Sequence, residues 1–291
     1  MLSIHVHSIV ADGMNVFYRE AGIAGHPVIL LLHGGIASSF QFRALMPLLA
    51  RDFHVIAPDL PGHGFTSPSQ ARAKPYQYIC LARQTLIAFV DALKLTSYAL
   101  YMFDFGAAVG YRLALAHPER VTAVIAQGGN AYIQGLGKAW EPVKALWGDV
   151  KQGGKRHVRQ RISWNYARGA LDSLGRALGL LARLGRTRKR PPDPSRITHV
   201  RVFALTPGTR ATRYPPRVLA DYKSTVELYP LFQRYLREWA PRVLAIWGTR
   251  DAFLSVDGAK MYRVDVPDAE IVCLMLGIFC WRRMLRRLRL R

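Results

Sequence analysis

Hydrophobic residues cluster in short uninterrupted runs, and the segments between these runs have helical spacing. The runs at residues 28–32 (VILLL), 98–103 (YALYMF) and 243–247 (VLAIW) are too short for core helices and predict buried strands. Two further strands are predicted at residues 54–57 and 121–127. Helices are predicted at about residues 38–49, 78–93, 107–116 and 228–239. This alternation predicts an α/β fold with a doubly wound, mostly parallel sheet.

The alternation stops after Asn130 and resumes near residue 220. We therefore expect residues 1–130 to form the first part of the core and residues 220–291 the second part. Residues 131–219 are expected to be an inserted helical lid. The tail from about residue 271 is atypical, because its sequence lacks the acidic positions of a helix that closes such a domain.

The net charge of +22 is concentrated in two segments. Residues 151–219 hold 17 Lys and Arg against 2 acidic residues, and residues 271–291 hold 6 Arg and no acidic residue. The remainder holds 18 basic and 17 acidic residues, so it is nearly neutral. The excess of positive charge lies in the two segments that depart from the alternation of strands and helices. We therefore expect neither a nucleic acid nor a membrane partner. A cytoplasmic protein is expected, because the N-terminal residues lack the pattern of a signal peptide.

Asp104 follows the predicted strand at residues 98–103 and precedes the predicted helix at residues 107–116. A side chain on such a sharp turn is exposed at the top of the sheet, where nucleophiles of α/β enzymes lie. Gly106 and Ala107 are small, as the crowded turn requires, whereas Met102 is larger than expected two positions before a nucleophile. The alternative is that Asp104 caps the helix that follows it.

Five motifs occur in order, and together they resemble one family. They are HGG at residues 33–35, DLPGHG at 59–64, FDFGAAVG at 103–110, HPERV at 117–121 and WGTRD at 247–251. Over residues 10–150 and 220–270 the chain resembles α/β-hydrolases with an aspartate nucleophile, including epoxide hydrolases and haloalkane dehalogenases. The resemblance implies the α/β-hydrolase fold, a small-molecule substrate, and neither a cofactor nor a metal. It implies nothing about the oligomeric state.

The resemblance also implies a role for four residues. Asp104 would attack a carbon atom and form an ester. The backbone N–H groups of Gly35 and Phe105 would form the oxyanion hole. Asp251 would orient a histidine base that activates water, although it could instead be a turn residue. The side chains of His33 and His63 are expected to be structural.

The resemblance also bears on the substrate class, through the position directly after the nucleophile and the position after His33 and Gly34. Dehalogenases of this family place a tryptophan and a polar side chain where this chain has Phe105 and Gly35. An epoxide hydrolase is therefore favoured over a haloalkane dehalogenase. Its epoxide oxygen would be polarised by lid tyrosines, for which Tyr132, Tyr166 and Tyr214 are candidates.

None of the nine histidines lies between Asp251 and Arg291, where the family places its base. With suitable codons, a shifted reading frame from residue 274 encodes DAGHFLLETHAEEIAAA, which supplies a histidine and an acidic helix. We therefore expect a hydrolase impaired by frame damage in its tail, with similar damage possible in the basic lid. Two alternatives remain, namely a base from His157 or His199 and a non-catalytic cationic binding protein.

Overall fold

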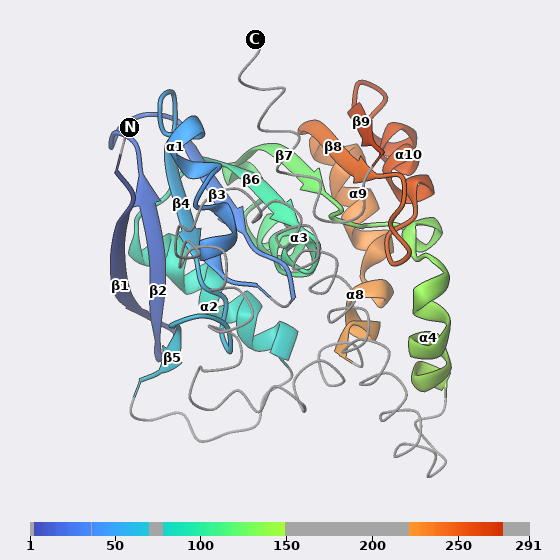
Figure 1. The fold of residues 1–291 in the computed structure, drawn as a ribbon, viewed down its shortest axis with the longest axis horizontal. Helices are drawn as coiled ribbons and strands as arrows, with labels where there is room; N and C mark the ends of the chain where they lie inside the picture. The colour runs from blue at the N-terminus through green and yellow to red at the C-terminus, as the bar shows by residue number, and fades with distance from the viewer. Residues whose placement is uncertain (1–2, 36, 70–77, 149–220, 276–291) are drawn as a thin grey trace, which may run out of the picture.

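The computed structural model describes residues 3–35, 37–69, 78–148 and 221–275 (Figure 1). Most of the expected lid and the tail beyond residue 275 lie outside these residues. So do Tyr166, Tyr214, His157 and His199, which the sequence offered as candidate site residues.

One sheet of nine strands organises the described residues, and its main path runs β1-β2-β4-β3-β6-β7-β8-β9, with β5 paired to β2. Strands β1, β2, β4 and β5 are joined by antiparallel pairs, whereas β4, β3, β6, β7, β8 and β9 are parallel. The strands are β1 (His5–Ala11), β2 (Met14–Ala21), β3 (Val28–Leu32), β4 (His54–Pro58), β5 (Ser67–Pro68), β6 (Tyr98–Phe103), β7 (Val121–Gln127), β8 (Arg242–Gly248) and β9 (Glu270–Leu274). The predicted doubly wound, mostly parallel sheet is confirmed.

The N-terminal hairpin of β1 and β2 is an addition to the predicted elements. Its two strands are joined at Asp12 and Gly13, which both have positive φ, 49° and 68°. Asp-Gly is the residue pair that two-residue hairpin turns favour. This dipeptide is the local sequence signal for the hairpin. The hairpin extends the sheet beyond β4 to an antiparallel edge (Figure 1).

The helices flank the sheet and mostly lie where the sequence placed them (Figure 1). They are α1 (Met46–Leu49), α2 (Tyr78–Ala92), α3 (Gly106–Ala116), α4 (Glu141–Gly148), α8 (Lys223–Glu227), α9 (Tyr229–Trp239) and α10 (Val256–Asp265). The 3-10 helices are η1 (Ser39–Phe42), η2 (Pro118–Arg120), η3 (Ile133–Gly135) and η4 (Lys138–Trp140). The first residues after Asn130 pack on the core, because η3 contacts α10 and the Gly137 N–H donates to the Phe253 carbonyl.

The single helix predicted at residues 38–49 is wrong. Ser38 does cap a helix, because its Oγ accepts from the Phe40 N–H, but this helix is the short η1. The α-helical turn of α1 starts only at Met46, with Pro47 in its first turn. A proline inside a longer helix would remove a backbone hydrogen bond and clash with the preceding turn, so the segment is divided there.

Alternate residues of the central strands pack on opposite faces of the sheet. In β3, Leu30 and Leu32 join the larger core under α2, α3, α9 and α10. Ile29 and Leu31 join a second cluster, with Phe42 and Met46 of η1 and α1. Both faces of the central strands are therefore buried, as continuous apolar runs in parallel strands predict. No helix in the described part of the chain is long and apolar enough to span a membrane.

Candidate active site

The site lies where the order of the strands reverses. The chain passes from β3 to β4 on one side of β3, and then returns to β6 on its other side. In open α/β sheets, ligands bind at the carboxyl ends of the strands beside such a reversal. Here the loop after β3 begins with His33, Gly34 and Gly35, and the turn after β6 begins with Asp104. The segments are 69 residues apart in sequence and meet at this edge.

Asp104 occupies a constrained turn at the end of β6. Its φ of 50° lies in the left-handed region, which few residues other than glycine adopt. The Asp104 N–H donates to the Gln127 carbonyl at 3.1 Å, and the Ala107 N–H donates to the Asp104 carbonyl at 3.1 Å. Sheet and helix therefore fix the backbone on both sides of the turn. The predicted position of Asp104 at the carboxyl end of a central, buried strand is confirmed.

The large Met102 side chain is accommodated by a glycine on α3. A Cβ atom placed on Gly110 would lie 2.3 Å from Met102 Sδ and 3.0 Å from Leu32 Cδ1. At Gly106 a Cβ would lie 2.4 Å from the Leu32 carbonyl oxygen. The helix can therefore approach the sheet closely despite Met102, because two glycines of FDFGAAVG face β3 and β6.

The Asp104 carboxylate faces the loop after β3. Its Oδ2 atom accepts a hydrogen bond from the Gly35 N–H at 3.1 Å. Burial raises the pKa of Asp104 to about 6, while hydrogen bonds from the Gly35 and Phe105 N–H groups lower it and the charge of Asp251 raises it. The N-cap residue of α3 is Phe105 and not Asp104, and the Phe105 side chain makes no capping hydrogen bond. The interpretation of Asp104 as a helix cap therefore fails.

Asp251 lies in the loop after β8, close enough to influence Asp104 electrostatically. Its Oδ1 atom accepts from the N–H groups of Phe253 at 2.8 Å and Leu254 at 3.1 Å. Burial raises the pKa of Asp251, and these two bonds lower it. Oδ2 has no hydrogen-bond partner among the described residues. Asp251 Oδ1 thus stabilises the turn after β8, whereas Oδ2 remains available to a second group.

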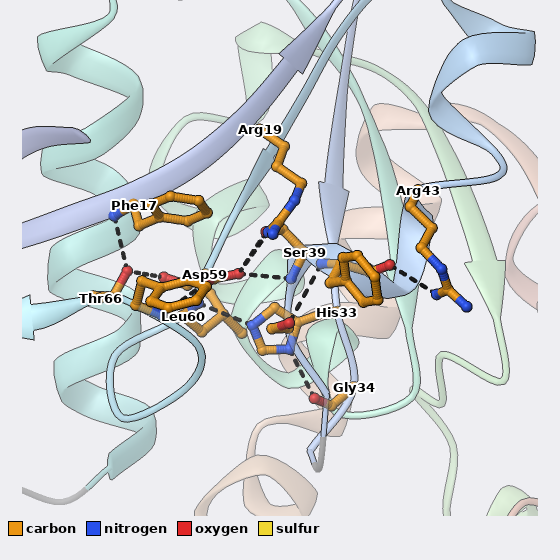
Figure 2. Close-up of polar contacts among 12 residues, drawn as sticks. Phe17, Arg19, His33, Gly34, Ser39, Arg43, Asp59, Leu60 and Thr66 are labelled. Carbon is orange, nitrogen blue, oxygen red and sulfur yellow. Dashed lines mark hydrogen bonds and ion pairs between the residues drawn. The ribbon is translucent and has the colours of Figure 1, made fainter. Parts of the chain in front are cut away.

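Two buried histidines hold the loop that carries Gly34 and Gly35. His33 Nε2 accepts from the Leu60 N–H at 2.9 Å, so its proton lies on Nδ1, which donates to the Gly34 carbonyl at 2.8 Å (Figure 2). His63 Nε2 lies 2.8 Å from the Gly35 carbonyl. Burial lowers the pKa of His33 to about 4 and that of His63 to about 3, so both rings are neutral near pH 7.

Asp59 anchors the neighbouring loop from inside the protein. Its side chain is fully buried and accepts from Ser39 N–H at 2.7 Å, Ser39 Oγ–H at 2.5 Å and Phe65 N–H at 2.9 Å. Arg19 Nη1 lies 3.9 Å from the Asp59 carboxylate (Figure 2). A buried carboxylate is tolerated only when hydrogen bonds and a charge compensate it. Asp59 therefore joins β2, η1 and the DLPGHG loop, a function that the sequence motif alone does not reveal.

The tyrosines near the site differ from those singled out in the sequence. Tyr132 is buried, and its hydroxyl donates to Asp265 at 2.7 Å, within the core. Tyr222, which the sequence analysis missed, packs on Phe105 with ring centroids 5.9 Å apart. Burial raises the pKa of Tyr222 to about 12, with a further contribution from Asp104. Its position just beyond the insertion offered no motif by which to find it.

The described residues contain no group of three or more His, Cys, Asp or Glu side chains arranged to hold a metal ion.

This fold and this elbow define an α/β hydrolase. The sequence profile of the family with the alpha/beta hydrolase fold matches residues 27–274, so the chain belongs to this family. It is therefore a hydrolase by family.

Individual relatives show how far the likeness extends. The chain is 38% identical over 273 residues to a protein described as the uncharacterized hydrolase YNR064C of Saccharomyces cerevisiae, covering 93% of this chain and 89% of the yeast protein. It is 32% identical over 120 residues to a haloalkane dehalogenase of Bradyrhizobium diazoefficiens, covering 41% and 37% of the two chains. The crystal structure of haloalkane dehalogenase DbeA from Bradyrhizobium elkani superimposes with a TM-score of 0.70 at 21% identity, covering 98% and 95%, which supports the fold alone.

Proposed function

We propose that this chain is a hydrolase that attacks an electrophilic sp³ carbon with Asp104, and that its substrate is an epoxide. The observation that carries the proposal is the Asp104 carboxylate at the elbow, with the Gly35 N–H on its Oδ2 atom. Oδ2 is held by this donor, so we assign the attack to Oδ1. A carboxylate suits displacement at carbon, whereas acyl transfer would favour a serine at the elbow.

In the first step, Asp104 Oδ1 bonds to an epoxide carbon and the carbon–oxygen bond of the ring breaks. The electron pair leaves on the former epoxide oxygen, which takes a proton. We assign this proton to the Tyr222 hydroxyl, because Tyr222 packs on Phe105 beside the nucleophile. The product is a hydroxyalkyl ester of Asp104.

In the second step, water attacks the carbonyl carbon of this ester. The developing negative charge would lie on Oδ2, where the N–H groups of Gly35 and Phe105 stabilise it. Asp251 would orient a histidine that accepts a proton of the water. The bond between Cγ and Oδ1 of Asp104 then breaks, the diol leaves with Oδ1 and a proton, and the proton held by the histidine returns to the Tyr222 phenolate. No histidine occurs at residues 252–291, the family match ends at residue 274, and the reading-frame shift that we hypothesise would also start at residue 274. We therefore propose that ester hydrolysis is the impaired step.

An alkyl halide is the second candidate substrate. Relatives named as haloalkane dehalogenases favour it. Against it stand Phe105 and Gly35, because neither side chain offers an N–H donor to a departing halide. An epoxide needs only a proton donor, which a tyrosine hydroxyl can be.

Intact-protein mass spectrometry tests the proposal and separates the two substrates. The chain is incubated at pH 7.5 with styrene oxide or with 1-bromobutane, and the modified residue is mapped by peptide sequencing. An epoxide adduct keeps the epoxide oxygen, whereas a halide adduct carries only the alkyl group. We expect one equivalent of epoxide adduct on Asp104 and no multiple turnover. Asp104→Asn should abolish the adduct, and the exposed-site control Asp257→Asn should preserve it.

Replacement of residues 274–291 by the shifted-frame segment should restore turnover. Steady turnover by the unchanged chain would contradict the impairment and direct attention to His157 or His199. Failure of both reagents to modify Asp104 would reject the nucleophile. In that case, tight and salt-sensitive binding to DNA or anionic vesicles would support the cationic binding protein.

A further inference from the structure

The donor that faces Asp104 belongs to an intrinsically flexible segment. Gly34 and Gly35 are adjacent, and glycine has more backbone freedom than any other residue. An oxyanion donor is effective only if it is already fixed in direction before the reaction, because reorienting it costs part of the stabilisation. The orientation of the Gly35 N–H must therefore come from contacts outside this dipeptide.

The peptide unit between Gly34 and Gly35 is held from its carbonyl side by His33. A trans peptide is planar, and its C=O and N–H groups point in opposite directions. The Gly34 carbonyl accepts from His33 Nδ1, and the N–H of the same unit points to Asp104 Oδ2. One bond therefore fixes one end of the unit, but rotation at the next peptide would still move Gly35.

The next peptide unit is held by His63. Its Nε2 atom lies 2.8 Å from the Gly35 carbonyl, whereas its Nδ1 atom lies 3.3 Å from the Pro61 carbonyl. A neutral ring carries a single proton, and the shorter contact assigns this proton to Nε2. The ring is 1% exposed and packs edge-on to His33, with centroids 4.8 Å apart. His63 contacts the Gly35 carbonyl, so it can act on Asp104 through the backbone of this loop.

We propose that His63 is a positioning residue, whose Nε2–H holds the Gly35 carbonyl so that the Gly35 N–H stays directed at the Asp104 carboxylate. This inference deepens the proposed function and rests on it for its catalytic consequence. The positioning itself can be measured without any reaction.

The titration of Asp104 reports on this geometry. The hydrogen bond from Gly35 lowers the pKa of Asp104 against the effect of burial. Loss of the bond should therefore raise the pKa of Asp104 above its value of about 6. The other groups that act on Asp104 are Asp251, Tyr222 and the Phe105 N–H. A change confined to the Gly35 amide and Asp104 would identify the loop as the cause.

The experiment compares His63→Leu, which removes the donor, with His63→Gln, whose amide N–H can reach Gly35. His117→Leu is the control, because His117 ends α3 beside Glu119 on another part of the protein. Glycine-selective ¹⁵N labelling follows the Gly35 amide signal from pH 4 to pH 8. Mass spectrometry follows the rate of Asp104 modification by styrene oxide over the same range.

We expect His63→Leu to raise the pH midpoint sensed by the Gly35 amide from about 6 to about 7 and to slow modification at pH 7 by about twofold, because about half of the Asp104 carboxylate would then be protonated. His63→Gln should bring both close to their values in the unchanged protein, and His117→Leu should change neither. If His63→Leu does not fold, His63→Asn replaces it, because its shorter amide cannot reach the Gly35 carbonyl.

An unchanged Gly35 titration and an unchanged rate in a folded His63→Leu variant would overturn the proposal. A Gly35 titration that depends on His63, in a chain that styrene oxide never modifies, would support the positioning and reject the proposed function instead.

Discussion

At the scale of single residues, the two glycines beside Asp104 do different things. A Cβ on Gly34 would lie 2.8 Å from Phe103 Cδ1 and 2.9 Å from Asp104 Oδ2, whereas a Cβ on Gly35 would meet nothing closer than 3.5 Å. Gly34 is therefore required by close packing at the elbow. Gly35 contributes its N–H group and has room for a side chain.

We expect Gly34→Ala to lose about 1–3 kcal/mol of unfolding free energy, because the methyl group overpacks the elbow. It should also slow modification of Asp104, since its methyl displaces the carboxylate. Gly35→Ala, as the matched control, should lose less than about 1 kcal/mol and remain reactive. Urea denaturation and adduct formation with styrene oxide measure the two effects. Equal losses in both variants would contradict this difference in packing.

Sequence reasoning reached some of these residues and not others. Asp104 and Gly35 were accessible because a nucleophile elbow and an HGG loop each require a local backbone arrangement that leaves a motif. Tyr222 was missed, and His63 was expected to be structural without its partner being identified. Both act through contacts between distant segments, and 28 residues separate His63 from Gly35. No local pattern encodes such a contact, so the structure was needed to find it.

At the scale of elements, the junction of β6 and α3 depends on a size match between two residues. Met102 is fully buried in β6, and Gly110 leaves space for its sulfur atom on α3. The boundaries of both elements were predictable, because the apolar run at residues 98–103 is too short for a core helix and the segment that follows Asp104 has helical spacing. The division of residues 38–49 was not predicted, because capping by Ser38 is compatible with either a long or a short helix.

We expect Gly110→Ala to destabilise the protein by about 1–3 kcal/mol through overpacking against Met102. Met102→Ala alone should cost about 2–5 kcal/mol, because it leaves a cavity. The double variant should be more stable than the sum of these losses by about 1 kcal/mol, since the new methyl group fills part of the cavity. Denaturant unfolding of the four proteins gives this coupling directly. Strict additivity would show that the two side chains do not compete for one space.

At the scale of the whole molecule, burial of the Asp104 carboxylate lowers the free energy of unfolding. The pKa of Asp104 rises from 3.8 to about 6 because burial disfavours its charged form. The folded protein therefore binds a proton more tightly than the unfolded chain does. Stability should increase as the pH falls from above 6 toward 4, and decrease as the pH rises through 6.

Asp104→Asn should remove this cost, and asparagine also tolerates the positive φ of the elbow. We expect an increase of about 1–3 kcal/mol in unfolding free energy at pH 7.5, and little difference at pH 4. Urea denaturation of both proteins at the two pH values measures it. Asp59→Asn is the contrasting control. The Asp59 carboxylate accepts hydrogen bonds from the Ser39 and Phe65 N–H groups, and an asparagine amide would weaken them, so this variant should have a lower unfolding free energy at pH 7.5. A less stable Asp104→Asn variant at pH 7.5 would contradict the prediction.

The pairing of β3 with β6 has a consequence for how the chain folds. Leu30 lies opposite Leu100, so a long loop must close before either strand gains a partner on that side. Domains dominated by such distant pairings fold slowly, and their incomplete sheets expose strand edges on which other molecules can aggregate. The Gly35–Asp104 contact cannot form before this pairing. The native environment of Asp104 should therefore appear late in folding. The completeness of refolding from denaturant should therefore be assessed at Asp104 and not from helix content. Helices are stabilised by contacts between residues that are close in sequence, so they form earlier.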